Sequence, residues 1–257
     1  MGGRLPSGSV NAPLHTPDWY LDHLRHEVTT TNRLLDGADL DAVVPSCPGW
    51  SVAQLVDHVG AVFGWANSAA STAERPAGFP MHADDEAPLI EWFAGRAATL
   101  IDTLDGLDPE GATWHHWPTD KLNRVWQRRM AQEITVHRWD LEGALGVTGA
   151  IDAELASDGI DEFLELYLPR PLGRDGAALP TGSLHLHCTD VEGEWLLELV
   201  DGEYRLTRAH QKGAAALRGP AETLLLWSWG RAPTSHDALS PVGDDQVLAE
   251  WAAFMGS

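Results

Sequence analysis

The sequence has little cysteine, few basic side chains and no long apolar run. Only Cys47 and Cys188 occur among 257 residues, so no disulfide framework is expected. Acidic side chains outnumber basic ones by 38 to 17, and this negative charge argues against nucleic-acid or membrane-surface partners. No stretch approaches the ~18 apolar residues of a membrane-spanning helix, and the N-terminus lacks a signal-peptide pattern. We therefore expect a cytoplasmic protein, either a monomer or a small homo-oligomer.

Several common catalytic signatures are also missing. The chain contains no Gly-rich phosphate loop, no serine nucleophile elbow and no pair of cysteines two residues apart. These absences argue against nucleotide-binding, serine-hydrolase and thiol-redox chemistry. The hydrophobic content of 44% is that of an ordinary globular protein with one large or two small domains.

The first part of the chain has apolar residues at helical spacing. Helices are expected from about 17 to 35, from a capping box at Ser51 and Gln54, over 84–104, and from Thr119 or Asn123 to Gly146 or Gly149. Four amphipathic helices of this length predict a four-helix bundle, and such bundles build metal sites from inward-facing side chains. A fifth helix is expected over 152–167.

A linker rich in proline and glycine follows, over 169–180, and the apolar period then changes from 3.6 to 2. Strands are expected around 183–189, 195–200, 204–207 and 214–218, with a hairpin turn at Asp201-Gly202, and helices over 221–229 and 244–255. The predicted fold is therefore α + (α+β). A helical domain at 17–168 precedes a small α+β domain at 181–257 with an antiparallel sheet.

The most informative stretch runs from Arg128 to Asp140. It holds Glu133 and His137 four residues apart, which places them ~40° apart on one helix face, one turn from each other. A carboxylate and an imidazole so placed can share a metal ion. His58, beside the apolar stripe of the second helix, is the best third ligand. We predict a zinc site formed by His58, Glu133 and His137, because two imidazoles and one carboxylate are a common catalytic zinc set with an open fourth position. The same donors also suit non-haem iron.

Other residues carry weaker signals. Asp57 and Asp140 could accept hydrogen bonds from the ligand imidazoles. Cys47 precedes a helix start, but a packing role is favoured over a reactive thiolate. His115 and His116 are expected to be exposed in a loop. His185 and His187 share one strand face without an evident third ligand, so a solvated face is favoured over a metal site.

The motifs also resemble a known family. Cys47-Pro48-Gly49-Trp50-Ser51-Val52 with Asp57-His58-Val59-Gly60, the stretch from Arg128 to Asp140, and the run from Gly219 to Arg231 are similar, in this order, to the mycothiol-dependent maleylpyruvate isomerase family. The resemblance covers nearly all of the chain after residue 17.

This resemblance implies a DinB-like four-helix bundle and a C-terminal domain akin to sterol-carrier proteins. It implies a divalent metal, usually zinc, held by His58, Glu133 and His137, with mycothiol as cosubstrate. In the isomerase the thiolate adds to an activated double bond, the bond rotates and the thiol leaves; other members transfer the thiol to an electrophile. The family also places a C-terminal-domain arginine in the active site, and Arg231 is the candidate by position.

The expected function is zinc-dependent activation of a small-molecule thiol for reaction with an electrophilic substrate. Two alternatives remain open. One is a metal- or ligand-binding bundle without turnover, with a structural zinc closed by Asp57, Cys47 or His115. The other is an iron-dependent oxygenase, for which the chain lacks a fuller His-x-x-x-Glu motif.

Overall fold

The computed structural model describes residues 15–83, 87–169 and 178–255. The chain divides into two compact units, Met1–Gly149 and Ala150–Ser257. This division comes before the predicted linker, because the fifth helix packs against a helix of the second unit. Most of the linker lies outside the described residues. In the described ranges, no helix combines the length and apolarity needed to span a bilayer.

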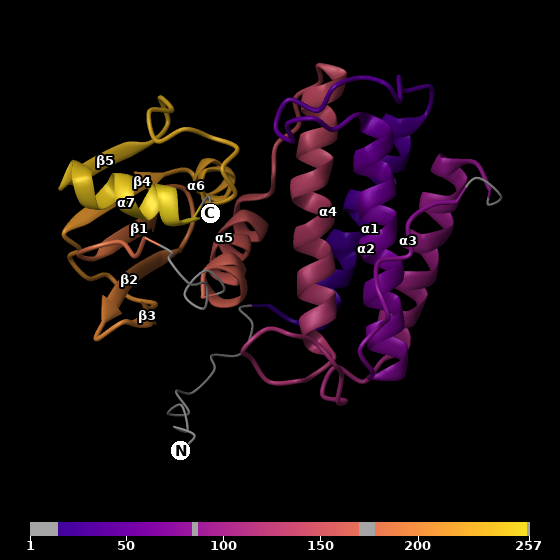
Figure 1. Cartoon of the computed structure of the whole chain (residues 1–257), viewed down its shortest axis with the longest axis horizontal. Helices are drawn as coiled ribbons and strands as arrows, with labels where there is room; N and C mark the ends of the chain where they lie inside the picture. The colour runs from indigo at the N-terminus through magenta and orange to yellow at the C-terminus, as the bar shows by residue number, and fades with distance from the viewer. Residues whose placement is uncertain (1–14, 84–86, 170–177, 256–257) are drawn as a thin grey trace. The chain divides into compact units, whose positions relative to one another are not determined.

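Four helices make up the core of the first unit (Figure 1). They pack in pairs: α1 contacts α3 and α4, and α2 contacts α3 and α4. Their apolar faces meet around fully buried side chains such as Leu24, Phe63 and Ile134. The helices are α1 (Pro17–Leu35), α2 (Val52–Thr72), α3 (Leu89–Gly106) and α4 (Arg124–Leu145).

Local sequence signals explain where these helices begin. Thr16 accepts a hydrogen bond from the backbone of Trp19 and so caps α1. The predicted capping box is present at α2, where Ser51 and Gln54 each bond the other's backbone. The third helix begins later than predicted, at Leu89, after Pro88. Its expected start at residue 84 lies outside the described residues.

Helices α2 and α3 approach closely at Gly60. A Cβ atom at this position would lie 2.1 Å from the Trp92 ring, closer than any real contact. The absence of a side chain therefore lets the indole of Trp92 pack directly on the backbone of α2. His58 lies two residues before Gly60 on the same helix, so this contact helps to fix the helix that carries it.

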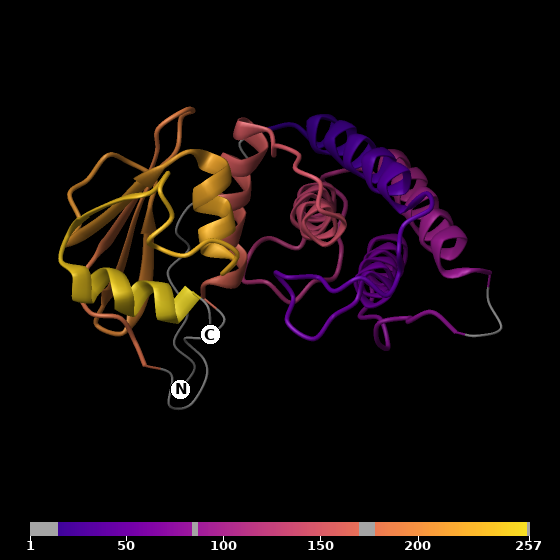
Figure 2. The same ribbon diagram turned by 90° about the horizontal axis from the view of Figure 1, so that it is seen from above.

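The second unit combines a mixed sheet with helices (Figure 2). The strand order is β3-β2-β1-β4-β5, so β1 lies at the centre. Helices α6 and α7 contact β1 and β4, and α5 packs on α6. The elements are α5 (Ala153–Glu162), a π-helical turn η1 (Phe163–Tyr167), β1 (Leu184–Cys188), β2 (Glu194–Val200), β3 (Glu203–Thr207), β4 (Ala215–Gly219), α6 (Ala221–Ser228), β5 (Ser240–Gly243) and α7 (Asp245–Met255).

The sheet differs from the prediction in two ways. The expected antiparallel arrangement is wrong for β1 and β4, which pair in parallel with Leu186 opposite Leu217. The alternating pattern of a strand does not encode the direction of its neighbour, so local patterning could not reveal this pairing. Strand β5 is not predicted by the pattern, because it is short, exposed and contains Pro241. The expected Asp201-Gly202 turn does join β2 and β3, and both residues have positive φ, 56° and 79°.

Candidate functional site

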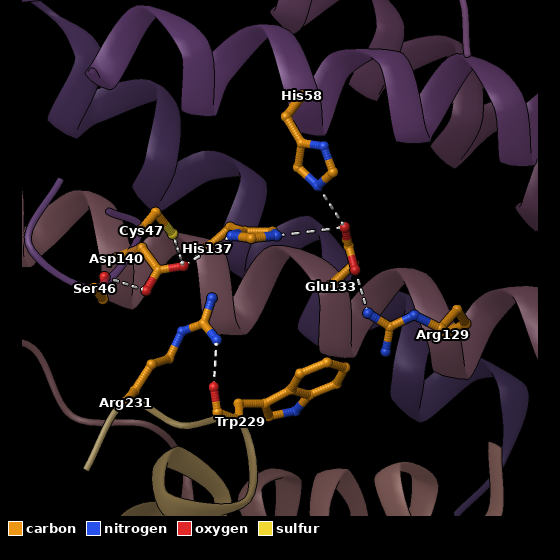
Figure 3. A network of polar contacts seen from close by, with 9 residues as sticks. All are labelled: Ser46, Cys47, His58, Arg129, Glu133, His137, Asp140, Trp229 and Arg231. Atoms are coloured by element: carbon orange, nitrogen blue, oxygen red, sulfur yellow. Dashed lines mark hydrogen bonds and ion pairs between the residues drawn. The ribbon is translucent and has the colours of Figure 1, made fainter. Parts of the chain in front are cut away.

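Three predicted ligands meet between α2 and α4 (Figure 3). Glu133 and His137 lie one turn apart on α4, and His58 reaches them from α2. The Nε2 atoms of His58 and His137 each lie 3.5 Å from the same oxygen, Glu133 Oε1. The side chains of Glu133 and His137 are each 13% exposed and that of His58 is 35% exposed, so the group is accessible from the His58 side. We call these three residues the helical donor set.

The second carboxylate oxygen of Glu133 faces a buried cation. Glu133 Oε2 pairs with the guanidinium of Arg129, one turn earlier on α4. Burial alone would raise the pKa of Glu133, but Arg129 and hydrogen bonds with His137 and His58 hold it well below its usual value. Glu133 is therefore an ionised acceptor with a fixed orientation. Sequence reasoning missed Arg129, although its spacing of four residues from Glu133 is a visible signal.

Asp140 holds the Nδ1 atom of His137. His137 Nδ1 lies 2.8 Å from Asp140 Oδ2, which leaves Nε2 directed at Glu133. Asp140 is fully buried, and it also accepts hydrogen bonds from Ser46 Oγ at 2.6 Å and Cys47 Sγ at 3.6 Å. Although burial opposes it, hydrogen bonds with Asp140 and Glu133 raise the pKa of His137. A metal ion at Nε2 would compete with a proton for this atom.

The donor geometry fits a small tetrahedral cation. Two ligand atoms bound ~2 Å from such an ion are about 3.3 Å apart. The two nitrogen-to-oxygen distances of 3.5 Å are close to this value, and all three donor atoms lie within 4.8 Å of one another. Two imidazole nitrogens and one carboxylate oxygen are donors that zinc accepts. The fold thus brings three candidate metal-binding donors together.

An apolar cavity reaches His137 inside the first unit. The cavity is small, with a volume of about 10 Å³, and it is partly open to solvent. Aliphatic and aromatic side chains from α2, α3 and α4 surround it, including Val59, Phe93 and Leu141. Such walls are apolar, so they lower the polarity on one side of His137 and strengthen electrostatic interactions there.

Two residues considered as a fourth ligand, Asp57 and His115, have different partners. Asp57 Oδ1 accepts the backbone N–H of His82 at 2.7 Å. The prediction that His115 is exposed is wrong, because only 2% of it is exposed. Its Nε2 lies 3.0 Å from the carbonyl of Asp120, and burial lowers its pKa to about 4. His116 is exposed, as predicted.

Arg231 belongs to the second unit. It lies three residues after the end of α6 and directly after Gly230, which has a φ of 71°. Its backbone N–H donates to the carbonyl of Leu226 at 2.7 Å, and its Nη1 donates to the carbonyl of Trp229 at 3.0 Å (Figure 3). These contacts hold both the backbone and the guanidinium of Arg231 against residues of its own unit.

The predicted solvated face at His185 and His187 is also wrong for His185, which is only 6% exposed. The structure adds two donors that sequence reasoning missed, Glu194 and His210. Glu194 could be found only from the strand register, because it lies opposite His187 on the neighbouring strand.

Comparisons with known proteins agree on both units. Residues 21–142 match the family model described as "Mycothiol maleylpyruvate isomerase N-terminal domain", and residues 154–250 match the "MDMPI C-terminal domain". No curated protein sequence gives a significant match.

Two solved structures share the fold. The crystal structure of the mycothiol-dependent maleylpyruvate isomerase has a TM-score of 0.61 at 14% identity, covering 88% of this chain and 93% of that chain. A histidine-to-alanine mutant of that isomerase gives 0.59 at the same identity and coverage. The two family matches together span most of the sequence, in the order of the two units. The chain therefore belongs to the mycothiol-dependent maleylpyruvate isomerase family.

Proposed function

We propose that this chain is a zinc-dependent enzyme that activates mycothiol as a thiolate, for addition to or transfer onto an electrophilic small molecule. The observation that carries the proposal is the meeting of His58 Nε2 and His137 Nε2 at one oxygen of Glu133. Family membership supports mycothiol as the thiol and an isomerisation as the reaction.

The proposal includes the finer architecture. The pairwise packing of α1 to α4 supports a DinB-like four-helix bundle as the metal-binding part. The mixed sheet with α6 and α7 supports an α+β domain akin to sterol-carrier proteins. In this arrangement the bundle supplies ligands from facing helices.

Each residue of the helical donor set has a defined task. His58, Glu133 and His137 would hold zinc, which when bound lowers the pKa of a thiol so that the thiolate forms near neutral pH. Glu133 stays ionised because Arg129 pairs with it. Asp140 orients the ring of His137 and is therefore a positioning residue.

An open fourth position favours thiol activation over a structural zinc. A structural site needs four protein ligands. Asp57 and His115 bond elsewhere, and the Cys47 thiol donates to Asp140, which lies at the Nδ1 side of His137. Among the described residues, the group around Glu133 Oε1 has three members. This supports room for an exchangeable thiol.

We propose Arg231 as the substrate-binding arginine of the second unit. A guanidinium binds a carboxylate through two parallel hydrogen bonds, which suits an anionic electrophile. Arg231→Ala should reduce turnover about a hundredfold without loss of zinc, and Arg231→Lys should recover part of it. Exposed Arg218 in β4 offers the control, Arg218→Ala. Equal effects of the two alanine variants would argue against this role.

The decisive test measures metal content and thiol response together. Wild type should hold one more zinc equivalent per chain than His137→Ala, and the cobalt-substituted protein should change its absorption spectrum when mycothiol is added. His26→Ala, which removes an exposed histidine from α1, is the matched control. Equal zinc content in wild type and His137→Ala, or a spectrum insensitive to thiol, would contradict the proposal. Iron instead of zinc in the purified protein would favour the alternative function, an iron-dependent oxygenase.

A further inference from the structure

A second group of metal-binding side chains lies in the second unit, within its sheet. His185 and His187 are two residues apart on β1 and therefore point to the same face. Glu194 on β2 is paired directly opposite His187. His210 follows β3, the strand next to β2. We call these four residues the strand donor set.

Their donor atoms converge on the carboxylate of Glu194. Its Oε1 lies 3.2 Å from His187 Nδ1, and its Oε2 lies 2.6 Å from His210 Nδ1 and 3.6 Å from His185 Nε2. The three imidazole rings are 5.5 to 6.1 Å apart between centroids. Their planes cross at 77° to 89°, so the rings do not stack. Four donor atoms, one from each residue, lie within 4.8 Å of one another.

An independent observation comes from His185. The residue is only 6% exposed, and its Nε2 is a buried atom without a hydrogen-bond partner in the described part of the chain. A buried polar atom left in this way costs free energy, so native proteins rarely keep one without a ligand, an ion or a water. This nitrogen lies 3.6 Å from Glu194 Oε2, within ion-pair distance but beyond hydrogen-bond distance, and the other two rings converge on the same carboxylate. The arrangement is that of a site built for a ligand.

We propose that His185, His187, Glu194 and His210 bind one zinc ion in the second unit. Three imidazole nitrogens favour zinc over calcium or magnesium, which prefer oxygen donors. Two of the three nitrogen-to-carboxylate distances, 3.2 and 3.6 Å, bracket the ~3.3 Å that separates two ligands of a tetrahedral zinc. The third, 2.6 Å from His210 Nδ1 to Glu194 Oε2, is that of a hydrogen bond, which zinc binding would have to replace. With four protein ligands the coordination is closed, so this zinc is structural. It would join β1, β2 and the segment that follows β3.

Access to this site comes from the solvent side. The exposed fraction of the side chain rises from 8% for His185 to 23% for His187 and 78% for His210. The ion can therefore enter past His210 and bind last to the buried ring of His185. Because only the folded sheet brings the donors together, bound zinc should stabilise the second unit by mass action.

The test uses the full chain with the helical donor set removed. His58→Ala and His137→Ala together leave the strand donor set as the candidate zinc site. After treatment with chelator, this double variant should take up one zinc per chain in a calorimetric titration, with a dissociation constant below about 1 μM. Its unfolding temperature should rise by several degrees when zinc is added. Failure to retain zinc through gel filtration, or binding weaker than about 100 μM, would overturn the proposal.

Ligand variants in this background locate the ion. His210→Ala removes a mostly exposed side chain, so it should weaken zinc binding at least tenfold while the metal-free fold is kept. His187→Ala should weaken zinc binding to the same extent. His185→Ala should weaken it as well, and in addition the smaller alanine should fill the buried position of His185 less well. His236→Ala, an exposed histidine of the same unit, should leave the affinity unchanged. Zinc affinity that is equal in His210→Ala, His187→Ala and their parent would mean that the histidines pair with Glu194 without a metal.

Discussion

The helical donor set and the strand donor set gather similar side chains by different means. On α4 the period of 3.6 brings Glu133 and His137 together, and His58 comes from a second helix. On β1 the period of 2 aligns His185 with His187, and the register of β2 adds Glu194. The first arrangement ends with three donors and the second with four. The number of donors, rather than their type, separates an exchangeable site from a closed one.

The two glutamates offer the sharpest contrast. Glu133 pairs with the buried Arg129, whereas the described contacts of Glu194 are with histidines. In metal-free protein, Glu133→Gln should lower the free energy of unfolding by about 3 kcal/mol, because a buried ion pair is broken on one side. Glu194→Gln should cost about 1 kcal/mol or less, because its side chain is partly exposed. Urea unfolding of the two matched variants measures the difference, and equal losses would remove the contrast.

Substitution of Asp140 tests how strongly zinc binding by the helical donor set depends on the hydrogen bond between Asp140 and His137. Asp140→Asn should weaken zinc binding at His58, Glu133 and His137 by about 10- to 100-fold, because the amide no longer holds the ring of His137 in the same way. Zinc at the strand donor set should be unaffected. Asp102→Asn, at an exposed position of α3, is the control. Weakening at both sites would indicate a general loss of folding instead.

His115 represents a buried histidine outside both donor sets. Burial lowers its pKa to about 4 from 6.5, so between these values the unfolded chain binds more protons than the folded one. Its contribution to stability is therefore present at pH 7 and lost as the pH falls through 6.5 towards 4. Between pH 7 and pH 5 the unfolding free energy should fall by about 1 to 2 kcal/mol more in wild type than in His115→Gln. The zinc content of His115→Gln should equal that of wild type. A lower content would indicate that His115 binds a metal ion.

The smallest effect concerns the turn that sets the register of β2 and β3. Gly202 has a φ of 79°, so Gly202→Ala should destabilise the second unit by about 1 kcal/mol. Because the register of these strands positions His210 near Glu194, zinc binding at the strand donor set should weaken slightly. Asp201→Asn should be nearly neutral, since asparagine tolerates positive φ. Zinc binding to the helical donor set should respond to neither variant.

Local patterns made most of the helices and the helical donor set predictable. The capping box at Ser51 and the spacing of Glu133 and His137 depend only on nearby residues, and His58 was placed by its position beside an apolar stripe. The expected bundle core is consistent with the buried faces of α1 to α4. The prediction that His58 is the third ligand also needed the assumption that α2 faces α4, and these two helices are in contact.

The missed features all depend on contacts between distant segments. Two of them are the parallel pairing of β1 with β4 and the position of Glu194 opposite His187. Both depend on how strands pair, which the sequence of a single strand does not determine. The burial of His115 follows from its bonds to the Asp120 carbonyl and to Lys121 in a compact loop. A loop position rich in polar residues predicted exposure, and specific hydrogen bonding overrode it.

The order of the strands has a consequence for how the chain acquires its sites during folding. Strands β1, β2 and β3 form an antiparallel meander of consecutive neighbours, and the strand donor set lies on β1, on β2 and in the segment that follows β3. The helical donor set instead requires α2 and α4 to dock, with His58 and Glu133 separated by 75 positions. The loop that the strand donor set closes is therefore shorter than the loop that the helical donor set closes. Bringing its side chains together costs less chain entropy, because the cost of loop closure rises with loop length.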